Sequence, residues 1–270
     1  KNSTIISEDI SLFYKNGTRF SAIFLDENGK ALANQNIVFV INGVSYTKTT
    51  DENGMASMGI GLVPNEYKVS AVFNGTDDYD MATADATVLV KSTILGNDTT
   101  LYFLNGTKYV AKFLDSDGKA LANTTVKFNI NGVFYTRVTD ENGMASLNIR
   151  LDPNSYIITA YNPVTGEQRA NEVTVLPRII AEDLSMKYLD GSSFNATLVD
   201  GQGKAVAGVN ITFNVNGVFY TSYTNENGTA KLNIKLYPEH YIITIIHPKG
   251  EKKGYNITVL PTIISKDLVK

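Results

Sequence analysis

The side chains of this chain best suited to chemistry are carboxylates gathered in turns. Residues 115–118, Asp-Ser-Asp-Gly, begin as a calcium-binding loop begins. Such a loop needs a further oxygen ligand at its fifth position and a glutamate at its twelfth, but Lys119 and Val126 stand there. We therefore expect a turn without a metal. A denser acidic cluster near the first predicted domain boundary leaves two interpretations open, a solvated loop, which we favour, or a calcium site. That cluster contains Asp77, Asp78, Asp80 and Asp85.

No set of residues that could carry nucleophilic or acid–base catalysis recurs along the chain. Cysteine is absent, which excludes disulfides and thiolate metal sites. The two histidines, His240 and His247, both lie in the last third, so a catalytic centre in every repeat has no imidazole to use. The chain has 24 basic and 27 acidic residues, so it lacks the excess of positive charge that would favour nucleic acid as a partner. It contains no run of 18 apolar residues, so no membrane-spanning segment is predicted. The sequence thus predicts no enzyme, no cofactor, no nucleic-acid partner and no membrane-embedded segment.

One segment of eight residues reveals how the chain is organised. Residues 50–57 and 139–146 both read Thr-Asp-Glu-Asn-Gly-Met-Ala-Ser, and residues 224–231 are a diverged third copy. The copies begin 89 and 85 residues apart. A unit of this length can hold a core of its own, so the repeats are predicted to be tandem domains.

The octapeptide spacing sets the predicted domain boundaries. Residues 263–268 repeat the pattern of residues 179–184, so residues 263–270 are expected to begin a fourth repeat of a longer natural protein. The three complete domains are predicted at residues 1–90, 91–177 and 178–262.

Alternation of apolar and polar residues predicts β-strands throughout each repeat. Phe20, Ala22 and Phe24 share one face of a predicted strand, and equivalent residues alternate in the other two repeats. An Asn-Gly pair recurs between two such strands and predicts a two-residue hairpin turn, because both turn positions need positive φ. The pairs lie at residues 42–43, 131–132 and 216–217.

The predicted hairpin of the second repeat also fixes which side chains face outward. In this register Val133 and Tyr135 point inward, and Phe134 between them points outward. Phe219 takes the same place in the third repeat, whereas the first repeat has Ser45. Outward phenylalanines in two repeats leave two interpretations open, cover by a neighbouring loop, which we favour, or a contact surface.

A tyrosine follows a proline by three residues in every repeat, at the predicted start of the penultimate strand. This placement is typical of the tyrosine corner of immunoglobulin-like sandwiches. With seven or eight short strands per repeat and no helical period, the predicted fold class is all-β, with three tandem Ig-like antiparallel β-sandwich domains. Almost no spacer separates one repeat from the next, so the domains are expected to stack end to end as an extended rod. The predicted corner residues are Tyr67, Tyr156 and Tyr241.

The pattern Asn-x-Ser/Thr, the acceptor for N-linked glycans in secreted chains, occurs more often than composition explains. Turns rich in Asn, Gly and Thr offer an alternative explanation, but we predict surface glycosylation. Asn2 also fits the pattern. The candidate acceptors are Asn16, Asn74, Asn97, Asn105, Asn123, Asn195, Asn210, Asn227 and Asn256.

The loop between the last two predicted strands differs in every repeat. Residues 74–80 of the first repeat are acidic, whereas residues 247–253 of the third are basic. Loops on a fixed scaffold often carry recognition, but unconstrained drift explains such variation equally well, so both interpretations stay open.

Four consecutive motifs of the second repeat carry a resemblance to a known family. They resemble the immunoglobulin-like repeats of adhesin-like surface proteins of methanogenic archaea and, more distantly, those of invasin-type bacterial adhesins. The resemblance extends over all three repeats, and the first repeat departs from it at Ser45 and in residues 74–85. The motifs are Asp-x-x-Gly-Lys-Ala-Leu-Ala-Asn at 115–123, Phe-Asn-Ile-Asn-Gly-Val-Phe-Tyr-Thr at 128–136, Thr-Asp-Glu-Asn-Gly-Met-Ala at 139–145 and Leu-x-Pro-x-x-Tyr-Ile-Ile-Thr-Ala at 151–160.

The resemblance implies a secreted, often glycosylated array that holds a binding tip away from the cell envelope. Our first hypothesis is a non-enzymatic stalk segment of a cell-surface adhesin, extracellular, whose partners are other cell surfaces or extracellular polymers reached through a tip outside this segment. The alternative is a structural subunit of an extracellular filament or viral fibre, which requires lateral self-association through outward phenylalanines or edge strands. Neither hypothesis names a ligand.

Overall fold

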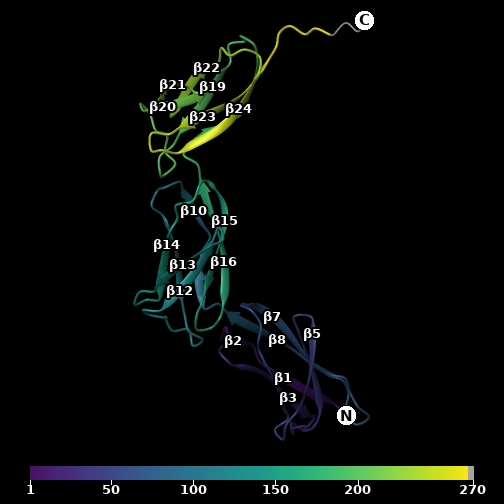
Figure 1. Ribbon diagram of the computed structural model, residues 1–270. Coiled ribbons are helices and arrows are strands. Elements are labelled where there is room, and N and C mark those ends of the chain that lie inside the picture. The colour runs from purple at the N-terminus through teal and green to yellow at the C-terminus, as the bar shows by residue number, and fades with distance from the viewer. Residues whose placement is uncertain (267–270) are drawn as a thin grey trace. The chain divides into compact units, whose positions relative to one another are not determined.

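The predicted strand at residues 20–24 and the segments on both sides of each Asn-Gly pair are β-strands in the computed structural model, which describes residues 1–266. The described residues form 24 strands and no helix. The predicted all-β fold is confirmed, because the same pair of sheets occurs three times along the chain and gives three tandem β-sandwiches (Figure 1). Of the predicted fourth repeat, Ile263 and Ile264 are exposed, and Asp267 and Leu268 lie outside the described residues.

Each sandwich pairs a three-stranded sheet with a five-stranded sheet. The orders are β1-β3-β6 with β2-β8-β7-β4-β5, then β14-β11-β9 with β10-β16-β15-β12-β13, then β17-β19-β22 with β18-β24-β23-β20-β21. The strands of the first sandwich are β1 (Ser3–Ser7), β2 (Ile10–Phe13), β3 (Arg19–Asp26), β4 (Asn36–Ile41), β5 (Val44–Thr49), β6 (Met55–Gly59), β7 (Asn65–Phe73) and β8 (Ala82–Lys91).

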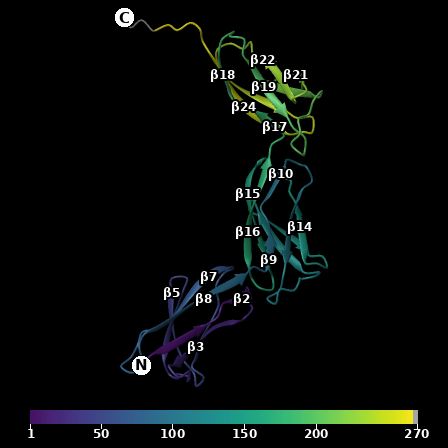
Figure 2. The same ribbon diagram turned by 180° about the vertical axis from the view of Figure 1, so that it is seen from behind.

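The other two sandwiches repeat this order, and Figure 2 gives the view from behind. The second contains β9 (Ile94–Gly96), β10 (Thr99–Tyr102), β11 (Lys108–Phe113), β12 (Thr125–Ile130), β13 (Val133–Val138), β14 (Met144–Asn148), β15 (Asn154–Tyr161) and β16 (Gln168–Leu176). The third contains β17 (Ile179–Ala181), β18 (Leu184–Lys187), β19 (Ser193–Leu198), β20 (Asn210–Val215), β21 (Val218–Tyr223), β22 (Thr229–Asn233), β23 (His240–Ile246) and β24 (Lys252–Leu260).

The chain divides into two compact units that do not coincide with the three repeats. The first unit comprises Lys1–Asn97, Val110–Leu147 and Ile157–Asn171, and the second comprises Asp98–Tyr109, Asn148–Tyr156 and the chain from Glu172. The middle sandwich contributes segments to both units. The domain boundaries given by the sequence therefore remain predictions.

The entry segment of each repeat is two strands, one in each sheet. β1 runs antiparallel to β3, and β2 runs parallel to β8. Between them the Asp9 carboxylate accepts the backbone N–H of Thr87 at 2.8 Å. Asp98 and Asp183 accept the corresponding N–H groups in the other sandwiches. An acidic side chain thus fixes the point at which the chain changes sheets.

The core of each sandwich consists of the side chains that alternate inward. Phe20, Ala22 and Phe24 are at most 1% exposed, as the period of two predicted. Phe20 meets Phe39 of the other sheet edge to face, with ring centroids 5.5 Å apart. Burial of each phenylalanine contributes about 1.5–3 kcal/mol, so the two-sheet arrangement follows from the apolar pattern.

The repeated octapeptide is a turn in which three residues have separate structural roles. The buried Thr50 hydroxyl donates to the Leu32 carbonyl at 2.6 Å. The Asp51 carboxylate accepts two backbone N–H groups of its own turn at 2.9 and 3.0 Å. Gly54 has φ of +72°, and a Cβ there would lie 2.6 Å from the Phe24 carbonyl oxygen. Only glycine fits that position, because it lacks a Cβ and tolerates positive φ.

The hairpin register predicted for the second repeat is correct, but one residue on its inward face is not buried. Asn131 and Gly132 have φ of +52° and +75°, and Asn129 pairs with Phe134. Val133, predicted to point inward, is 49% exposed. β13 is the fifth strand of a sheet whose partner sheet has three strands, so residues at its start lie beyond the facing sheet.

Candidate functional site

The outer strands β5, β13 and β21 each end a five-stranded sheet, and no further strand pairs with them among the described residues. Their side chains are mostly exposed, with Phe134 at 63% and Phe219 at 62%. The Phe134 ring packs against the Tyr161 ring, with ring centroids 5.8 Å apart. No loop of residues 1–266 covers either phenylalanine, so within these residues both are exposed for contact.

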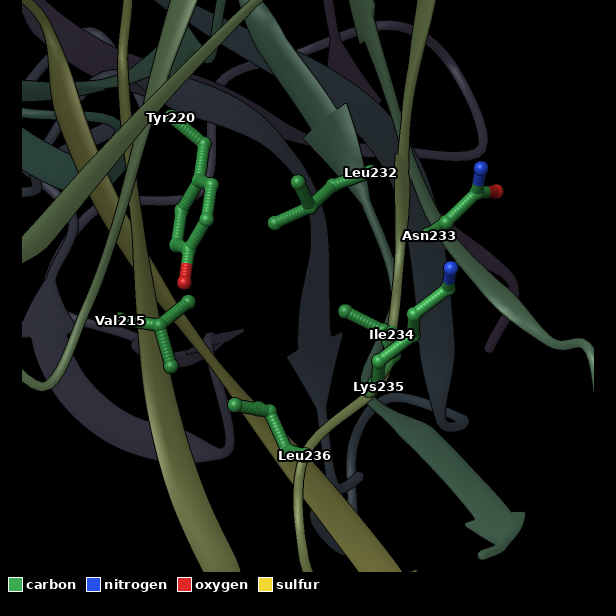
Figure 3. Close-up of a pocket in the computed structure, with 7 residues that line it drawn as sticks. All are labelled: Val215, Tyr220, Leu232, Asn233, Ile234, Lys235 and Leu236. Carbon is green, nitrogen blue, oxygen red and sulfur yellow. The ribbon is translucent and has the colours of Figure 1, made fainter. Parts of the chain in front are cut away.

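The third sandwich has an apolar cavity of about 200 Å³ beside β21 (Figure 3). Val215 and Tyr220 line one side, and Leu232, Ile234 and Leu236 line the other. It opens where β21 and β22, the last strands of the two sheets, leave the sandwich uncovered. Small-molecule sites usually occupy about 300–1,000 Å³ and include a few convergent polar groups. The cavity is smaller than that range, and Asn233 and Lys235 complete its lining.

The loop between β15 and β16 carries a buried acid that the sequence did not single out. Glu167 is 5% exposed. Its Oε1 accepts the Thr93 N–H at 2.5 Å and the Thr93 hydroxyl at 2.9 Å, and its Oε2 accepts the Ser92 hydroxyl. Asn162, at the start of the loop, donates to the Leu114 carbonyl at 2.8 Å. This loop therefore fastens residues 92–93, which connect the first repeat to the second.

The third sandwich places a more strongly charged group at the same position. The Glu251 Oε2 accepts the Arg178 N–H at 3.0 Å, and His247 lies buried beside it. Among residues 1–266, three polar atoms of this cluster have no hydrogen-bond partner. They are Arg178 Nε, His247 Nε2 and Glu251 Oε1. Burial raises the pKa of Glu251 and lowers the pKa of His247, and the charges of Arg178 and Lys249 lower the latter further. Unpaired buried polar atoms are costly, so this cluster is a weak point of the third sandwich.

These loops therefore have a structural role that neither interpretation of the sequence included. Recognition and drift were both open for the variable loops, but in two sandwiches the loop ends in an acid that binds the chain entry. The signal was present in the sequence as a Gly-Glu pair directly before the last strand, at residues 166–167 and 250–251. The first sandwich lacks this pair, and its loop instead meets the N-terminus, whose amino group lies 3.7 Å from Asp80.

The predicted corner tyrosines all donate a hydrogen bond to the backbone four residues earlier. In each case the accepting carbonyl belongs to the residue before the proline. Burial raises the pKa of all three phenols, so the hydroxyls stay protonated and can donate near neutral pH. The bonds are Tyr67 to Val63 at 2.6 Å, Tyr156 to Asp152 at 2.7 Å and Tyr241 to Tyr237 at 2.9 Å.

The candidate glycan acceptors fall into two groups. Asn16 and Asn105 are half-buried, and the amide nitrogen of each donates a hydrogen bond at 2.9 Å. The remaining seven have exposed side chains. They are Asn74, Asn97, Asn123, Asn195, Asn210, Asn227 and Asn256.

The acidic turns form local hydrogen bonds. The Asp115 carboxylate accepts the N–H groups of Asp117 and Lys119, both at 2.9 Å, which closes the turn without a cation. In residues 1–266, no group of three or more His, Cys, Asp or Glu side chains is placed to hold a metal ion. The same residues contain no helix that could cross a membrane.

Comparison with known proteins gives no family. No family model and no curated protein matches the chain. Among solved structures, a 1.5-MDa bacterial ice-binding adhesin is 18% identical, with 95% of this chain and 98% of that chain covered and a TM-score of 0.25. An adhesin with which an Antarctic bacterium binds ice is 14% identical, with 98% of this chain and 75% of that chain covered and a TM-score of 0.26. A glucan-binding protein of Bacteroides ovatus is 13% identical, with 97% of this chain and 71% of that chain covered and a TM-score of 0.27. Similarity at this level carries no argument about function.

Proposed function

We propose that this chain is a non-enzymatic stalk segment of a secreted cell-surface adhesin. The observation that supports the proposal best is the repetition of one sandwich three times with the same turn network and the same sheet order. The surfaces differ between repeats, and no cluster of reactive side chains recurs. A fold that repeats without a repeated reactive site suits a protein whose role is to extend away from the cell. Its partners, such as other cell surfaces or extracellular polymers, would be contacted by a tip outside this segment.

Small-angle scattering on residues 1–270 tests the extension that a stalk needs. A single compact globule of this length has a radius of gyration of about 18–19 Å. Three sandwiches end to end, each about 35–40 Å long from strand length and loops, give a value above about 30 Å. A measured value near 20 Å refutes the extended array. Antibody labelling of intact cells tests the extracellular location separately, since an intracellular protein stays unlabelled until the cells are opened.

A second candidate function, a subunit of an extracellular filament, is favoured by the exposed outer strands. β13 and β21 present unpaired backbone edges with Phe134 and Phe219 beside them. Such edges pair with other chains unless they are blocked. Concentration-dependent assembly in sedimentation, abolished in Phe134→Ser with Phe219→Ser, supports the filament. Serine is the residue that the first repeat has at this position, Ser45, so the variant keeps a native surface.

We also propose that exposed sequons carry glycans, as in secreted chains. Exposed side chains are reachable by a modifying enzyme, which supports the seven exposed candidates and leaves out Asn16 and Asn105. Peptide mass spectrometry of protein from its natural source tests this, and unmodified asparagine at all seven positions contradicts it.

A further inference from the structure

The Asp-x-x-Gly turn after the third strand of each sandwich has the same geometry in all three repeats. The carboxylate of Asp26, Asp115 or Asp200 accepts two backbone N–H groups of the turn at 2.8 to 2.9 Å. The turn glycine has positive φ, +78° at Gly29 and +81° at both others. Each turn is therefore a fixed piece of backbone that leaves the bare face of a glycine at the surface.

In the first unit, an aromatic ring covers the turn formed by residues 115–118. A Cβ at Gly118 would lie 2.3 Å from Cε2 of Phe13, so the ring packs directly on the glycine. Beside it, the Asn16 amide nitrogen donates to the Ser116 carbonyl at 2.9 Å. The Lys91 amino group lies 4.1 Å from the centroid of the Phe13 ring, within cation–π range. Residues about 100 positions apart thus form an apolar contact and a polar contact together.

In the second unit, the same pair of contacts occurs on the turn formed by residues 200–203. A Cβ at Gly203 would lie 2.4 Å from the hydroxyl oxygen of Tyr102. The Asn105 amide nitrogen donates to the Gly201 carbonyl at 2.9 Å. Tyr102 and Asn105 stand 89 residues after Phe13 and Asn16. The contact is therefore part of the repeat and not an accident at one position.

The third turn, residues 26–29, provides a comparison within the same chain. It has the same carboxylate hydrogen bonds, but nothing lies within 4 Å of a Cβ built on Gly29. In the third sandwich, Lys187 and Asp190 stand at the positions where the first two sandwiches have the aromatic residue and the asparagine of this contact. The glycine is thus required by the turn in all three repeats and by the packing of a ring in two of them.

We propose that the turns at residues 115–118 and 200–203 are docking turns, each of which binds the aromatic residue and the asparagine of the preceding sandwich. Asn16 and Asn105 therefore serve this contact and carry no glycan, although both lie in sequons. The amide nitrogen that a glycan would occupy is the atom that donates to the turn carbonyl. The proposal rests on the repeated contacts, and it holds whatever the array displays.

Cysteine cross-linking tests the contact directly, because the natural chain contains no cysteine. A Cβ at Gly201 would lie 2.9 Å from the Asn105 Cβ, close enough for a disulfide after a small shift. We expect Asn105→Cys with Gly201→Cys, and Asn16→Cys with Ser116→Cys, to cross-link at least about tenfold faster than a control pair. The control joins Asn105→Cys to Ser116→Cys, which lie before and after β11 in the chain. Equal rates in the matched and control pairs overturn the proposal.

Glycine substitutions test whether the bare turn is needed for the contact. Gly118→Ala puts a methyl group where the Phe13 ring lies, whereas Gly29→Ala introduces the same positive-φ strain with no ring present. In the Asn16→Cys, Ser116→Cys background, Gly118→Ala is expected to slow cross-linking and Gly29→Ala to leave it unchanged. Equal effects of the two substitutions, or a glycan on Asn16 or Asn105 in natural material, contradict the proposal.

Discussion

The replacement Glu167→Ala tests the buried hydrogen bonds that fasten the start of the second sandwich. It removes the acceptor for the backbone N–H of Thr93, a residue that is 0% exposed. An unpaired buried N–H costs about 1–3 kcal/mol. The Ser92 hydroxyl can still donate to the Ile94 carbonyl, and the Thr93 hydroxyl keeps a partner in Thr165, so neither hydroxyl adds to this cost. We expect the free energy of unfolding of this sandwich to fall by about 1–3 kcal/mol.

Glu167→Gln is the matched control for that variant. The glutamine carbonyl can still accept the Thr93 N–H, and its amide can donate to the Ser92 oxygen, whose hydrogen can go to the Ile94 carbonyl. The expected loss is below about 1 kcal/mol.

Hydrogen exchange followed by mass spectrometry on residues 1–270 measures both variants locally. A loss of about 1–3 kcal/mol speeds exchange of the Thr93 amide roughly 5- to 150-fold, whereas the glutamine variant stays within about fivefold of the natural protein. Unchanged protection in Glu167→Ala refutes the reasoning, and so does a glutamine variant that is as unprotected as the alanine variant.

Three further predictions concern other positions. Tyr241→Phe leaves a carbonyl unpaired and is expected to lower the stability of the third sandwich by about 1–2 kcal/mol in denaturant titration; no loss removes the corner assignment. Burial raises the pKa of Glu251, so its protonation stabilises the fold below pH 4.5 and that stability is lost as the pH rises through the folded-state pKa. Burial lowers the pKa of His247, so the neutral ring stabilises the fold above pH 6.5 and that stability is lost as the pH falls through the folded-state pKa. Glu251→Gln should abolish the first dependence and keep the second, and a melting profile against pH that matches the natural protein rules this out. Gly143→Ala, which places a Cβ 2.7 Å from a backbone oxygen, should lower thermal stability more than Gly29→Ala by at least about 1 kcal/mol; equal melting points contradict it.

The parts of the fold that could be predicted from sequence are those set by neighbouring residues. An Asn-Gly turn needs positive φ at both positions, so residues 131–132 fixed the register of β12 and β13. Thr50, Asp51 and Gly54 work within one turn and against the strand beside it, and their repetition marked the three sandwiches. Period-two alternation identified the core face for the same local reason.

What the sequence did not predict depends on contacts between distant segments. The exposure of Val133 follows from the unequal number of strands in the two sheets, which no local pattern encodes. Nothing near Glu167 in the sequence distinguishes it from other acidic loop residues, because its hydrogen-bond partners Ser92 and Thr93 lie about 75 residues earlier. Asn16 matched a sequon, and only the position of the Ser116 carbonyl shows its second role.

The parallel pairing of the second and last strands of each sandwich has a mechanical consequence. β2 lies beside β8, β10 beside β16 and β18 beside β24, each over four residues and in the same direction. A pull that moves the two strands of such a pair apart along their length strains the bonds of the ladder together instead of opening them one after another. Forced unfolding is governed by the rate of crossing that barrier, so we expect the parallel ladder to slow the forced unfolding of each sandwich.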